Sequence, residues 1–350
     1  MTAADFKPVR LAIVGCGAHT EYAHLPAAIR SHLIELTALV DRDLERAALL
    51  KRKYGCSAVT ANRLEAVVDF ADAVVIVTPN HTHKPLAEVA LRHGIHVFVQ
   101  KPMSTNYSDA LALCELARAK GLIIAVGIQG RHFACVKLMK RLIEEGFFGK
   151  ITGFDCEFGV RGGYSSVSGY NLSRDQAGGG ILVTAGTHYL DRMLYWFGEP
   201  TKVEFADDSY GGVEGSCKGR MQFVGGLEGS FFFSKSIALK NKFLIQTERY
   251  VVELPASETE RLTLFPRGSP GIRMEIGGCA GNAGIDYSQH YHQVELEDFA
   301  RCIRTGSRPV VDGMEGSRSV RLSDALYACR TQLPEPWVWY RQPTQRAAVA

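Results

Sequence analysis

The chain has 350 residues, of which 46% are hydrophobic and 22% are charged, and its formal net charge is +3. This length is typical of about two domains, and this composition is typical of a folded globular enzyme. Basic residues never form a long run, so the charge pattern gives no support to nucleic-acid binding. The longest apolar runs, such as 122–126, have the length of strands and fall far short of the ~20 residues of a membrane span. We therefore expect a soluble protein without a membrane or nucleic-acid partner.

The nine cysteines are scattered along the chain, and none of them forms a Cys-x-x-Cys pair. An odd number of unclustered cysteines favours reduced thiols over a disulfide framework. Residues 1–10 include Asp5 and lack the apolar segment of a signal peptide. These features predict a cytoplasmic location.

The first third of the chain alternates short apolar runs with amphipathic segments. The predicted strands are 9–14, 34–40, 73–77, 96–99 and 122–126, and the predicted helices are 25–31, 44–53, 84–93 and 104–120. Continuous β-branched runs separated by helices are typical of parallel strands that are buried on both faces. With right-handed crossovers, such units build a doubly wound α/β sheet.

The pattern changes after about residue 127. A helix at 133–145 precedes longer strands, and two helices at 287–305 and 314–329 close the chain. The predicted strands are 151–158, 203–207, 217–224, 227–234, 243–247 and 250–254. Their alternation and their short turns predict an α+β domain with an open, mainly antiparallel sheet.

A glycine motif, Gly15-x-Gly17, follows the first predicted strand and precedes a helix, which is the context of a dinucleotide-binding fingerprint. Gly15 permits a tight turn, and Gly17 lets backbone N–H groups approach a pyrophosphate. Thr20 stands at the third position, where Gly or Ala is usual, so looser packing of helix on strand is expected. Asp41 ends the second strand, where a carboxylate accepts hydrogen bonds from the adenosine ribose and repels a 2′-phosphate. The motif favours NAD(H), and the neighbouring Arg42 leaves NADP(H) as the alternative.

Other residues at the carboxyl ends of the predicted strands are expected to contact the same cofactor. They are Ala18, Thr78, Pro79, Asn80, His83, Gln100 and Lys101. His81 and His83, like His290 and His292, have no carboxylate or thiolate at a matching spacing, so we expect no metal site.

Lys101 is the sharpest single candidate for catalysis. It follows a buried strand, and Pro102 stops the strand from continuing. A lysine in the crevice at this edge can hydrogen-bond the reacting oxygen and lower the pKa of an alcohol that is being oxidised. The alternative is an ordinary solvated lysine at the end of a strand.

A second candidate segment begins with three glycines at 178–180 and continues into a predicted helix. Thr184, His188 and Asp191 are spaced to share one face of that helix. This arrangement offers a titratable imidazole with orienting partners, as general acid–base catalysis requires. The alternative is a histidine that only packs beneath the sheet.

The polar and aromatic segment 161–176 precedes this helix and suits a ligand with many hydroxyl groups, and the alternative is a disordered loop. The expected substrate contacts, in this segment and nearby, are Arg131, Tyr164, Asn171, Arg174, Thr184, Thr187 and Asp191.

Taken in order, these motifs resemble those of the Gfo/Idh/MocA family of oxidoreductases. The resemblance is carried by Gly-Cys-Gly at 15–17 with His24-x-Pro26, Thr-Pro-Asn-His-Thr-His at 78–83, His-Val-Phe-Val-Gln-Lys-Pro at 96–102, Gly-Gly-Gly to Leu-Asp at 178–191, Glu-Asp-Phe at 297–299, Arg-Thr-Gly-Ser-Arg-Pro-Val at 304–310, and Glu-Gly at 315–316. It implies a dinucleotide-binding Rossmann domain over 1–127 and a substrate-binding domain over 128–340, whose sheet mediates homodimers or homotetramers. It also implies that Lys101 and His188 act beside a nicotinamide.

Two positions depart from the family pattern. Gln100 replaces the usual glutamate before Lys101, and Thr184 stands where an aspartate is common. A neutral hydroxyl cannot stabilise an imidazolium as a carboxylate does. Either Asp191 or the substrate compensates, or proton transfer rests mainly on Lys101 and His188.

The resemblance predicts reversible hydride transfer between NAD(P)(H) and a secondary alcohol or ketone of a sugar, sugar derivative or cyclitol. Some relatives instead use tightly held NAD⁺ for redox-neutral glycoside cleavage, and others are non-catalytic regulators. The presence of both Lys101 and His188 argues against a regulator.

Overall fold

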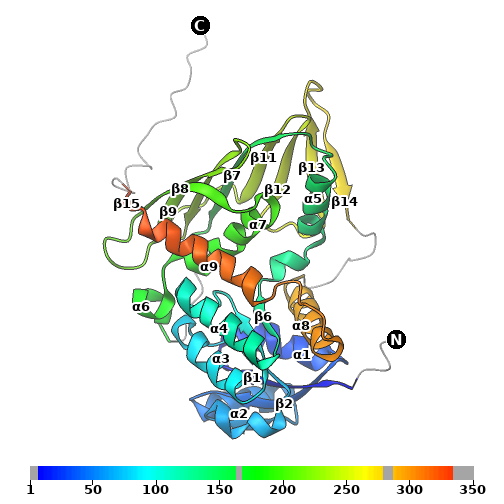
Figure 1. Ribbon diagram of the computed structural model, residues 1–350, viewed down its shortest axis with the longest axis vertical. Coiled ribbons are helices and arrows are strands. Elements are labelled where there is room, and N and C mark those ends of the chain that lie inside the picture. The colour runs from blue at the N-terminus through cyan, green and yellow to red at the C-terminus, as the bar shows by residue number, and fades with distance from the viewer. Residues whose placement is uncertain (1–6, 163–167, 279–286, 334–350) are drawn as a thin grey trace.

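The computed structural model describes residues 7–162, 168–278 and 287–333, which build two sheets with helices around them (Figure 1). The first sheet is entirely parallel and has the strand order β3-β2-β1-β4-β5-β6. Its strands are β1 (Val9–Val14), β2 (Ile34–Val40), β3 (Val59–Ala61), β4 (Ala73–Ile76), β5 (His96–Gln100) and β6 (Ile124–Gly127). Its crossovers contain η2 (Thr20–His24), α1 (Leu25–Arg30), α2 (Leu44–Tyr54), η3 (Leu64–Ala66), η4 (Val68–Phe70), η5 (Asn80–Thr82), α3 (His83–Arg92) and α4 (Tyr107–Lys120).

This arrangement confirms the predicted doubly wound Rossmann domain. The bounds of β1 and β2 are those that the sequence predicts, because both strands are continuous apolar runs inside the sheet. The prediction missed β3, which is an edge strand of three residues with no buried side chain. So short a run carries no periodicity.

The second sheet is mixed and has the order β14-β13-β12-β11-β7-β10-β9-β8-β15. Its strands are β7 (Ile151–Gly159), β8 (Pro200–Asp207), β9 (Ser216–Phe223), β10 (Glu228–Ser234), β11 (Lys242–Thr247), β12 (Tyr250–Pro255), β13 (Arg261–Pro266), β14 (Met274–Gly277) and β15 (Arg330–Gln332). The pairs β10–β7 and β15–β8 are parallel and the others are antiparallel. The predicted mainly antiparallel sheet is therefore confirmed, and the prediction missed β13, β14 and β15.

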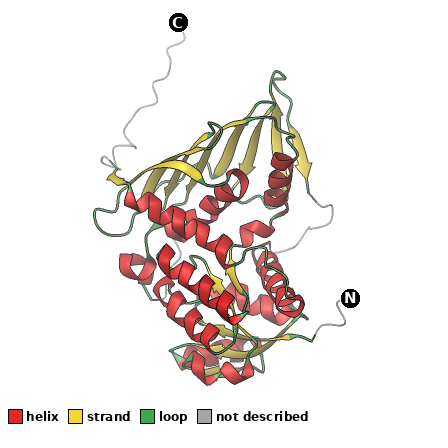
Figure 2. Cartoon of the chain, in the orientation of Figure 1, coloured by secondary structure: helices red, strands yellow, loops and turns green. Residues whose placement is uncertain are grey.

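Helices cover one face of this second sheet (Figure 2). The remaining helices are η6 (Gln129–His132), α5 (Ala134–Glu144), η7 (Tyr170–Leu172), α6 (Arg174–Ala177), η8 (Leu182–Gly186), α7 (Thr187–Phe197), α8 (Tyr287–Thr305) and α9 (Gly313–Ala328). Aromatic side chains fill the layer between helix and sheet, and Trp196 lies edge-on to Phe243 with 5.1 Å between ring centroids.

The last two helices pack against the first domain although they come at the end of the chain. On α8, Leu296, Phe299 and Ala300 belong to the same buried cluster as the apolar residues of β1. The ring of Phe299 lies 5.8 Å from that of Phe98 on β5. Helix α9 packs on α4 and β6 as well as on α7. The two domains are thus joined by helices from the C-terminal part of the chain.

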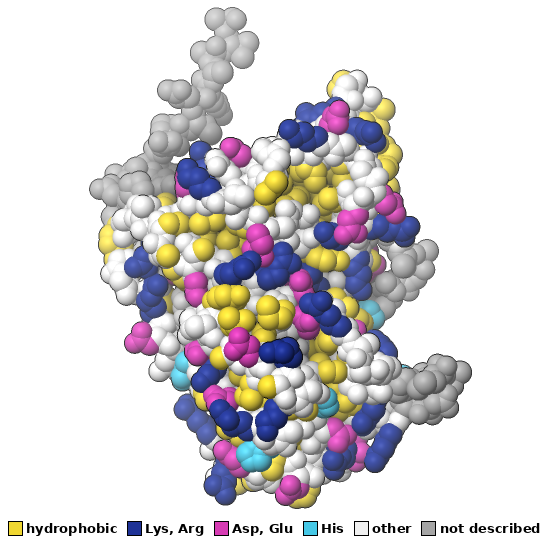
Figure 3. Space-filling view, in the orientation of Figure 1, with side chains coloured by type: hydrophobic (Ala, Val, Ile, Leu, Met, Phe, Trp, Pro, Cys, Tyr) yellow, Lys and Arg dark blue, Asp and Glu magenta, His cyan; other side chains and the backbone are white. Residues whose placement is uncertain are grey.

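The surface carries charges of both signs, interspersed over the face shown in Figure 3. Within the described ranges, no helix is both long and apolar enough to cross a bilayer. All eight cysteines in these ranges are free.

Candidate active site

The glycine loop after β1 packs against Val77, is held by Thr20, and is open beside Gly17. Gly15 has φ +97°, and a Cβ on it would lie 2.3 Å from the carbonyl oxygen of Val77. A Cβ on Gly17 would meet nothing within 4 Å. The hydroxyl of Thr20 donates to the carbonyl oxygen of Gly15 at 2.5 Å, so the unusual third position holds the turn with its side chain. The open side over Gly17 fits a pyrophosphate at the start of the following helix.

Asp41 lies against this loop at the end of β2. One carboxylate oxygen accepts from the backbone N–H of Cys16 at 2.7 Å, and the other accepts from that of Asp43 at 2.9 Å. Arg42 and Ala18 are exposed beside it. The carboxylate retains acceptor capacity at the position where a dinucleotide presents its ribose hydroxyls. These residues therefore fit an NAD-type cofactor.

The segment after β4 places Thr78 next to Gly15, and Pro79 follows Thr78 in the chain. The polar groups of Asn80 and His83 are used inside the protein. The Asn80 amide donates to the carbonyl oxygen of Ala177 at 2.7 Å and is buried. The two nitrogens of the buried His83 ring lie 2.8 Å from the carbonyl oxygens of Pro102 and Thr78, and the neutral ring donates to one of them. With both nitrogens occupied, His83 positions the loops after β4 and β5, in place of the direct cofactor contact that the sequence predicts.

Lys101 lies immediately after β5 and reaches the other domain. Its ammonium donates to the carbonyl oxygen of Thr184 in η8 at 2.5 Å. Burial lowers the pKa of Lys101 to about 8, and the charge of Lys235 adds to the effect. Nearby His83 holds the Pro102 carbonyl, which fixes the backbone just beyond the lysine. A half-buried amine whose pKa is lowered to about 8 can both give and take a proton.

The side chain of Gln100 is directed away from this lysine. Its amide nitrogen lies 2.7 Å from Nε2 of His24, and both residues are buried. A Cβ on Gly127 would lie 2.4 Å from that amide, so the glycine of β6 makes room for it. Gln100 therefore binds η2, and the cofactor contact predicted for it is replaced by this internal bond.

His188 lies in the first turn of α7, after a wide π-helical turn, η8. The Thr184 hydroxyl donates to the carbonyl oxygen of Gly180 at 2.8 Å. Burial lowers the pKa of His188 well below its usual value, and the charge of Lys101 lowers it further. The shift favours the neutral imidazole, and the pKa of Lys101 lies closer to neutrality than that of an ordinary lysine.

Asp191 does not assist His188, contrary to the sequence-based expectation. It is buried and forms a two-point ion pair with Arg131, with Nε–Oδ2 and Nη2–Oδ1 distances of 2.6 and 2.9 Å. Arg131 also bonds Glu315 at 3.1 Å. Arg131 and Asp191 therefore neutralise each other inside the protein, and neither is free for the predicted substrate contact.

The three glycines before η8 make room for the protein itself. A Cβ on Gly179 would lie 1.9 Å from the Tyr327 hydroxyl, and one on Gly180 would lie 2.0 Å from the Glu214 carbonyl oxygen. The buried Glu214 carboxylate accepts from the N–H groups of Gly180 and Leu182 and from the Tyr327 hydroxyl. The close approach expected at these glycines is thus an internal contact.

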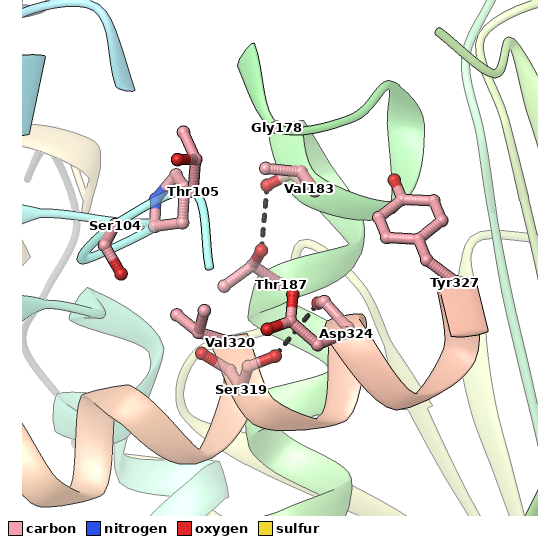
Figure 4. Close-up of a pocket in the computed structure, with 11 residues that line it drawn as sticks. Ser104, Thr105, Gly178, Val183, Thr187, Ser319, Val320, Asp324 and Tyr327 are labelled. Atoms are coloured by element: carbon pink, nitrogen blue, oxygen red, sulfur yellow. Dashed lines mark hydrogen bonds between the residues drawn. The ribbon is translucent and has the colours of Figure 1, made fainter. Parts of the chain in front are cut away.

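The remaining substrate predictions have different outcomes. Tyr164 lies outside the described residues, and Asn171 lies half-buried in η7. The Arg174 guanidinium lies 4.8 Å from the centre of the Tyr327 ring. The Thr187 hydroxyl donates to the carbonyl oxygen of Val183 and is buried, so it is not available to a substrate (Figure 4). Roles for Asn171 and Arg174 stay predictions.

Figure 4 shows a small pocket beside this region, between α9 and the η8–α7 segment. Thr105, Asp324 and Tyr327 are among its lining residues, which include neither Lys101 nor His188. It is therefore separate from the candidate catalytic pair.

Sequence reasoning missed Lys235, which follows β10 and acts electrostatically on Lys101. The signal was the one that identified Lys101, a lysine directly after an apolar strand. Glu214 was missed as well. No local pattern marks it, because its partners are far along the chain.

Comparison with known proteins agrees with this geometry. Residues 9–128 match a family model described as "Oxidoreductase family, NAD-binding Rossmann fold", and residues 136–253 match the "GFO/IDH/MocA C-terminal domain". A dTDP-3,4-didehydro-2,6-dideoxy-alpha-D-glucose 3-reductase of Streptomyces violaceoruber is 27% identical over 219 residues, 63% of either chain. The D-glucoside 3-dehydrogenase of Escherichia coli is 27% identical over 221 residues, 62% of either chain. The matched part thus spans less than two thirds of these relatives.

A solved levoglucosan dehydrogenase, in complex with NADH and levoglucosan, has the same fold. It superposes with a TM-score of 0.82 at 19% identity, over 92% of this chain and 97% of that one.

Proposed function

The chain belongs to the Gfo/Idh/MocA oxidoreductase family, and we propose that it transfers a hydride between NAD(H) and a secondary alcohol or ketone of a sugar, sugar derivative or cyclitol. The single observation that carries the proposal is the position of Lys101. Its amine lies at the carboxyl end of a central parallel strand, donates to Thr184 across the domain junction, and has a pKa of about 8.

The cofactor is held by the first domain. Gly15 and Gly17 would accommodate the pyrophosphate, and Asp41 would accept from the ribose hydroxyls, with Arg42 exposed beside it. Thr78 and Pro79 would lie over the same edge. A bound nicotinamide supplies the hydride acceptor or donor. Because Asp41 carries a negative charge, we expect NAD(H) to be preferred over NADP(H).

Lys101 moves the proton in this proposal. As a neutral amine, Nζ accepts the proton of the substrate hydroxyl during oxidation, and as an ammonium it donates to the carbonyl oxygen during reduction. Neutral His188 accepts or donates a hydrogen bond without adding a charge, since its pKa lies well below its usual value. This assigns Lys101 the titrating role and His188 an orienting one.

The substrate class is supported by the names of two relatives, both of which place the reaction at carbon 3 of a hexose. Hydroxyl groups at this position therefore come first among the compounds to test. Asn171 and Arg174, on the segment before the three glycines, are the proposed contacts to the sugar.

The experiment measures reduction of NAD⁺ and of NADP⁺ by absorbance, with a panel of glycosides, sugar acids and cyclitols. Lys101→Ala is compared with wild type and with Lys202→Ala, which removes an exposed lysine of β8. We expect Lys101→Ala to lower kcat/KM at least 100-fold and Lys202→Ala to leave it unchanged.

A residual kcat/KM within tenfold of wild type in Lys101→Ala would refute the proposed role of this lysine. If no compound reduces either cofactor while NAD⁺ stays bound through purification, glycoside cleavage without net redox change becomes the better assignment.

We also propose that the protein is a homodimer or homotetramer that pairs through its large sheet. Helices cover one face of this sheet (Figure 2), and the strands carry alternating side chains of intermediate exposure toward the other. Light scattering coupled to size exclusion measures the mass directly, and a monomer at micromolar concentration would refute this assembly.

A further inference from the structure

Three histidine rings meet between the glycine loop and α8, outside the catalytic pair. The rings of His19, His24 and His292 are mutual neighbours, with centroids 5.0 to 5.1 Å apart. One nitrogen from each ring lies within 4.8 Å of those from the other two. His24 and His292 are buried, and His19 retains partial exposure. The cluster joins two segments that are more than 260 residues apart.

A π-helical turn brings His19 and His24 together. They are five residues apart, and in an α-helix this spacing separates two side chains by about 140° around the axis. The π-helix η2 spans Thr20–His24, and its i→i+5 pattern places both rings on one side. Such turns are uncommon and occur frequently at functional sites.

Each ring has a partner on its other nitrogen. The Tyr22 hydroxyl lies 3.1 Å from His19 Nδ1, the Gln100 amide lies 2.7 Å from His24 Nε2, and the Glu295 carboxylate lies 2.7 Å from His292 Nδ1. Metal-bound histidines are typically fixed in this way, by a carboxylate, carbonyl or hydroxyl on the nitrogen that does not bind the metal. Exchange of the oxygen and nitrogen of the Gln100 amide lets it accept from His24 Nε2–H, which frees Nδ1 as a ligand.

Two of the nitrogens that face the centre have no hydrogen-bond partner although they are buried. They are Nε2 of His19 and Nδ1 of His24. A buried polar atom is rarely left without a partner in a native protein, so a water molecule or an ion is expected beside these two nitrogens. The third nitrogen, Nε2 of His292, is the one left after Glu295 has taken Nδ1.

We propose that His19, His24 and His292 bind one Zn²⁺ ion, which ties the glycine loop to α8. Imidazole ligands without a thiolate suit zinc, and three of them leave a fourth position for water. Tetrahedral zinc–nitrogen bonds of about 2.1 Å place the ligand nitrogens about 3.4 Å apart, so small ring rotations must draw the three inward. His19 and Tyr22, both partly exposed, lie where an ion enters.

Charged groups near the three histidines both favour and disfavour a bound cation. The buried Glu295 carboxylate, which has one oxygen without a hydrogen-bond partner, compensates a cation through His292. Lys101 opposes it, because its charge acts on His19. Burial also holds the pKa of His19 and His24 below the usual value, so both rings are in the neutral form that binds metals.

The test uses full-length protein without a polyhistidine tag, stripped with a chelator and supplied with ZnCl₂. Metal content is measured by mass spectrometry, and affinity is measured by competition with a chromophoric chelator. We expect one zinc per chain in wild type and in His290→Gln, an exposed histidine on the same helix. His19→Gln and His292→Gln should bind at least 100-fold more weakly. Glu295→Gln should weaken binding 10- to 100-fold, as loss of such outer partners does.

Thermal unfolding provides a second measurement, since zinc should raise the Tm of wild type and of His290→Gln but not that of His292→Gln. If His292→Gln does not fold, His19→Gln and Glu295→Gln decide the outcome. Less than one zinc per chain in wild type, as expected if water fills the cluster, would overturn the proposal. Equal zinc affinity in wild type and His19→Gln would do so too. Neither measurement depends on dehydrogenase activity, so the two proposals fail separately.

Discussion

The two glycine segments, 15–17 and 178–180, look alike in sequence and differ in what lies beside them. Next to Gly17, a Cβ would meet nothing within 4 Å. A Cβ on Gly179 would lie 1.9 Å from the Tyr327 hydroxyl, and a Cβ on Gly180 would lie 2.0 Å from the Glu214 carbonyl oxygen, so both would overlap with the protein. Gly17 leaves space for a ligand, whereas Gly179 and Gly180, like Gly15 beside Val77, admit another part of the same chain. A glycine motif therefore indicates a close approach without indicating which partner makes it.

Polar groups of the two domains differ in the same way, because those of the first domain keep capacity for a ligand and those of the second have internal partners. Asp41 and Lys101, on the first domain, each bond only to backbone groups in the hydrogen bonds described above and keep capacity for a ligand. Asp191 and Glu214, on the second domain, are both buried. Their carboxylates accept hydrogen bonds from other groups of the protein. We therefore expect substitutions on the first side to change binding and turnover, and substitutions on the second side to change stability.

The largest effect on stability is expected for Asp191→Ala. It leaves the Arg131 guanidinium buried without its two-point partner, and Glu315 compensates only in part. Removing one member of a buried ion pair destabilises a protein by about 3–5 kcal/mol. Urea unfolding measures the change. Glu145→Ala breaks an exposed pair with Arg141 and is the control, with a loss below about 0.5 kcal/mol. Equal losses in the two variants would show that the Arg131–Asp191 pair does not stabilise this side.

Gly180→Ala is expected to cost about 2 kcal/mol. Its Cβ would overlap the backbone of Glu214, which cannot move aside as a flexible side chain can, and overpacking of this kind costs about 1–3 kcal/mol. The same unfolding measurement applies. An unchanged midpoint would mean that the loop containing Glu214 and the glycine turn separate easily, and the contrast between Gly17 and Gly180 would lose its basis.

Gly17→Ala should affect cofactor binding more than stability. Its stability should change by less than about 0.5 kcal/mol, because the added methyl group points into open space. NAD⁺ should bind about tenfold more weakly, equivalent to ~1.4 kcal/mol, because the methyl group occupies space expected for the pyrophosphate. Calorimetric titration measures this. Unaltered affinity would move the pyrophosphate away from this loop.

The smallest effect concerns pH. Burial lowers the pKa of Lys101 to about 8, so the amine becomes neutral as the pH rises through that value. The rate of alcohol oxidation should increase across this range, and the rate of ketone reduction should decrease. Lys101→Ala should abolish the inflection in kcat/KM. An inflection between pH 6 and 7 that persists in this variant would instead identify His188 as the titrating group.

The sequence predicted the first domain closely, because its strands are buried runs whose period and connections are local. A local signal, a lysine after an apolar strand, also made Lys101 a catalytic candidate, and that role stays a prediction. The predictions from the sequence failed where the outcome depended on distant partners. Helical spacing suggested that Asp191 faces His188, but a π-helical turn precedes α7 and Arg131 holds the carboxylate.

The same limit applies to His83 and Gln100. Both lie at the predicted sheet edge, yet their polar atoms bond to Pro102, Thr78 and His24. Nothing within a few residues of either one encodes those bonds. The histidine cluster was missed for this reason as well, since its third member lies on α8.

The packing of α8 on the first domain has a consequence for how the protein is made. Phe299 completes the buried layer around Phe98, and both are only 1% exposed. Phe299 lies 172 residues after Gly127, the end of β6, so all six strands of the parallel sheet are synthesised before it. During that interval the apolar surface of β1 and β5 lacks its natural cover. A chain that stops before α8 therefore exposes the apolar surface that Phe299 covers in the complete fold.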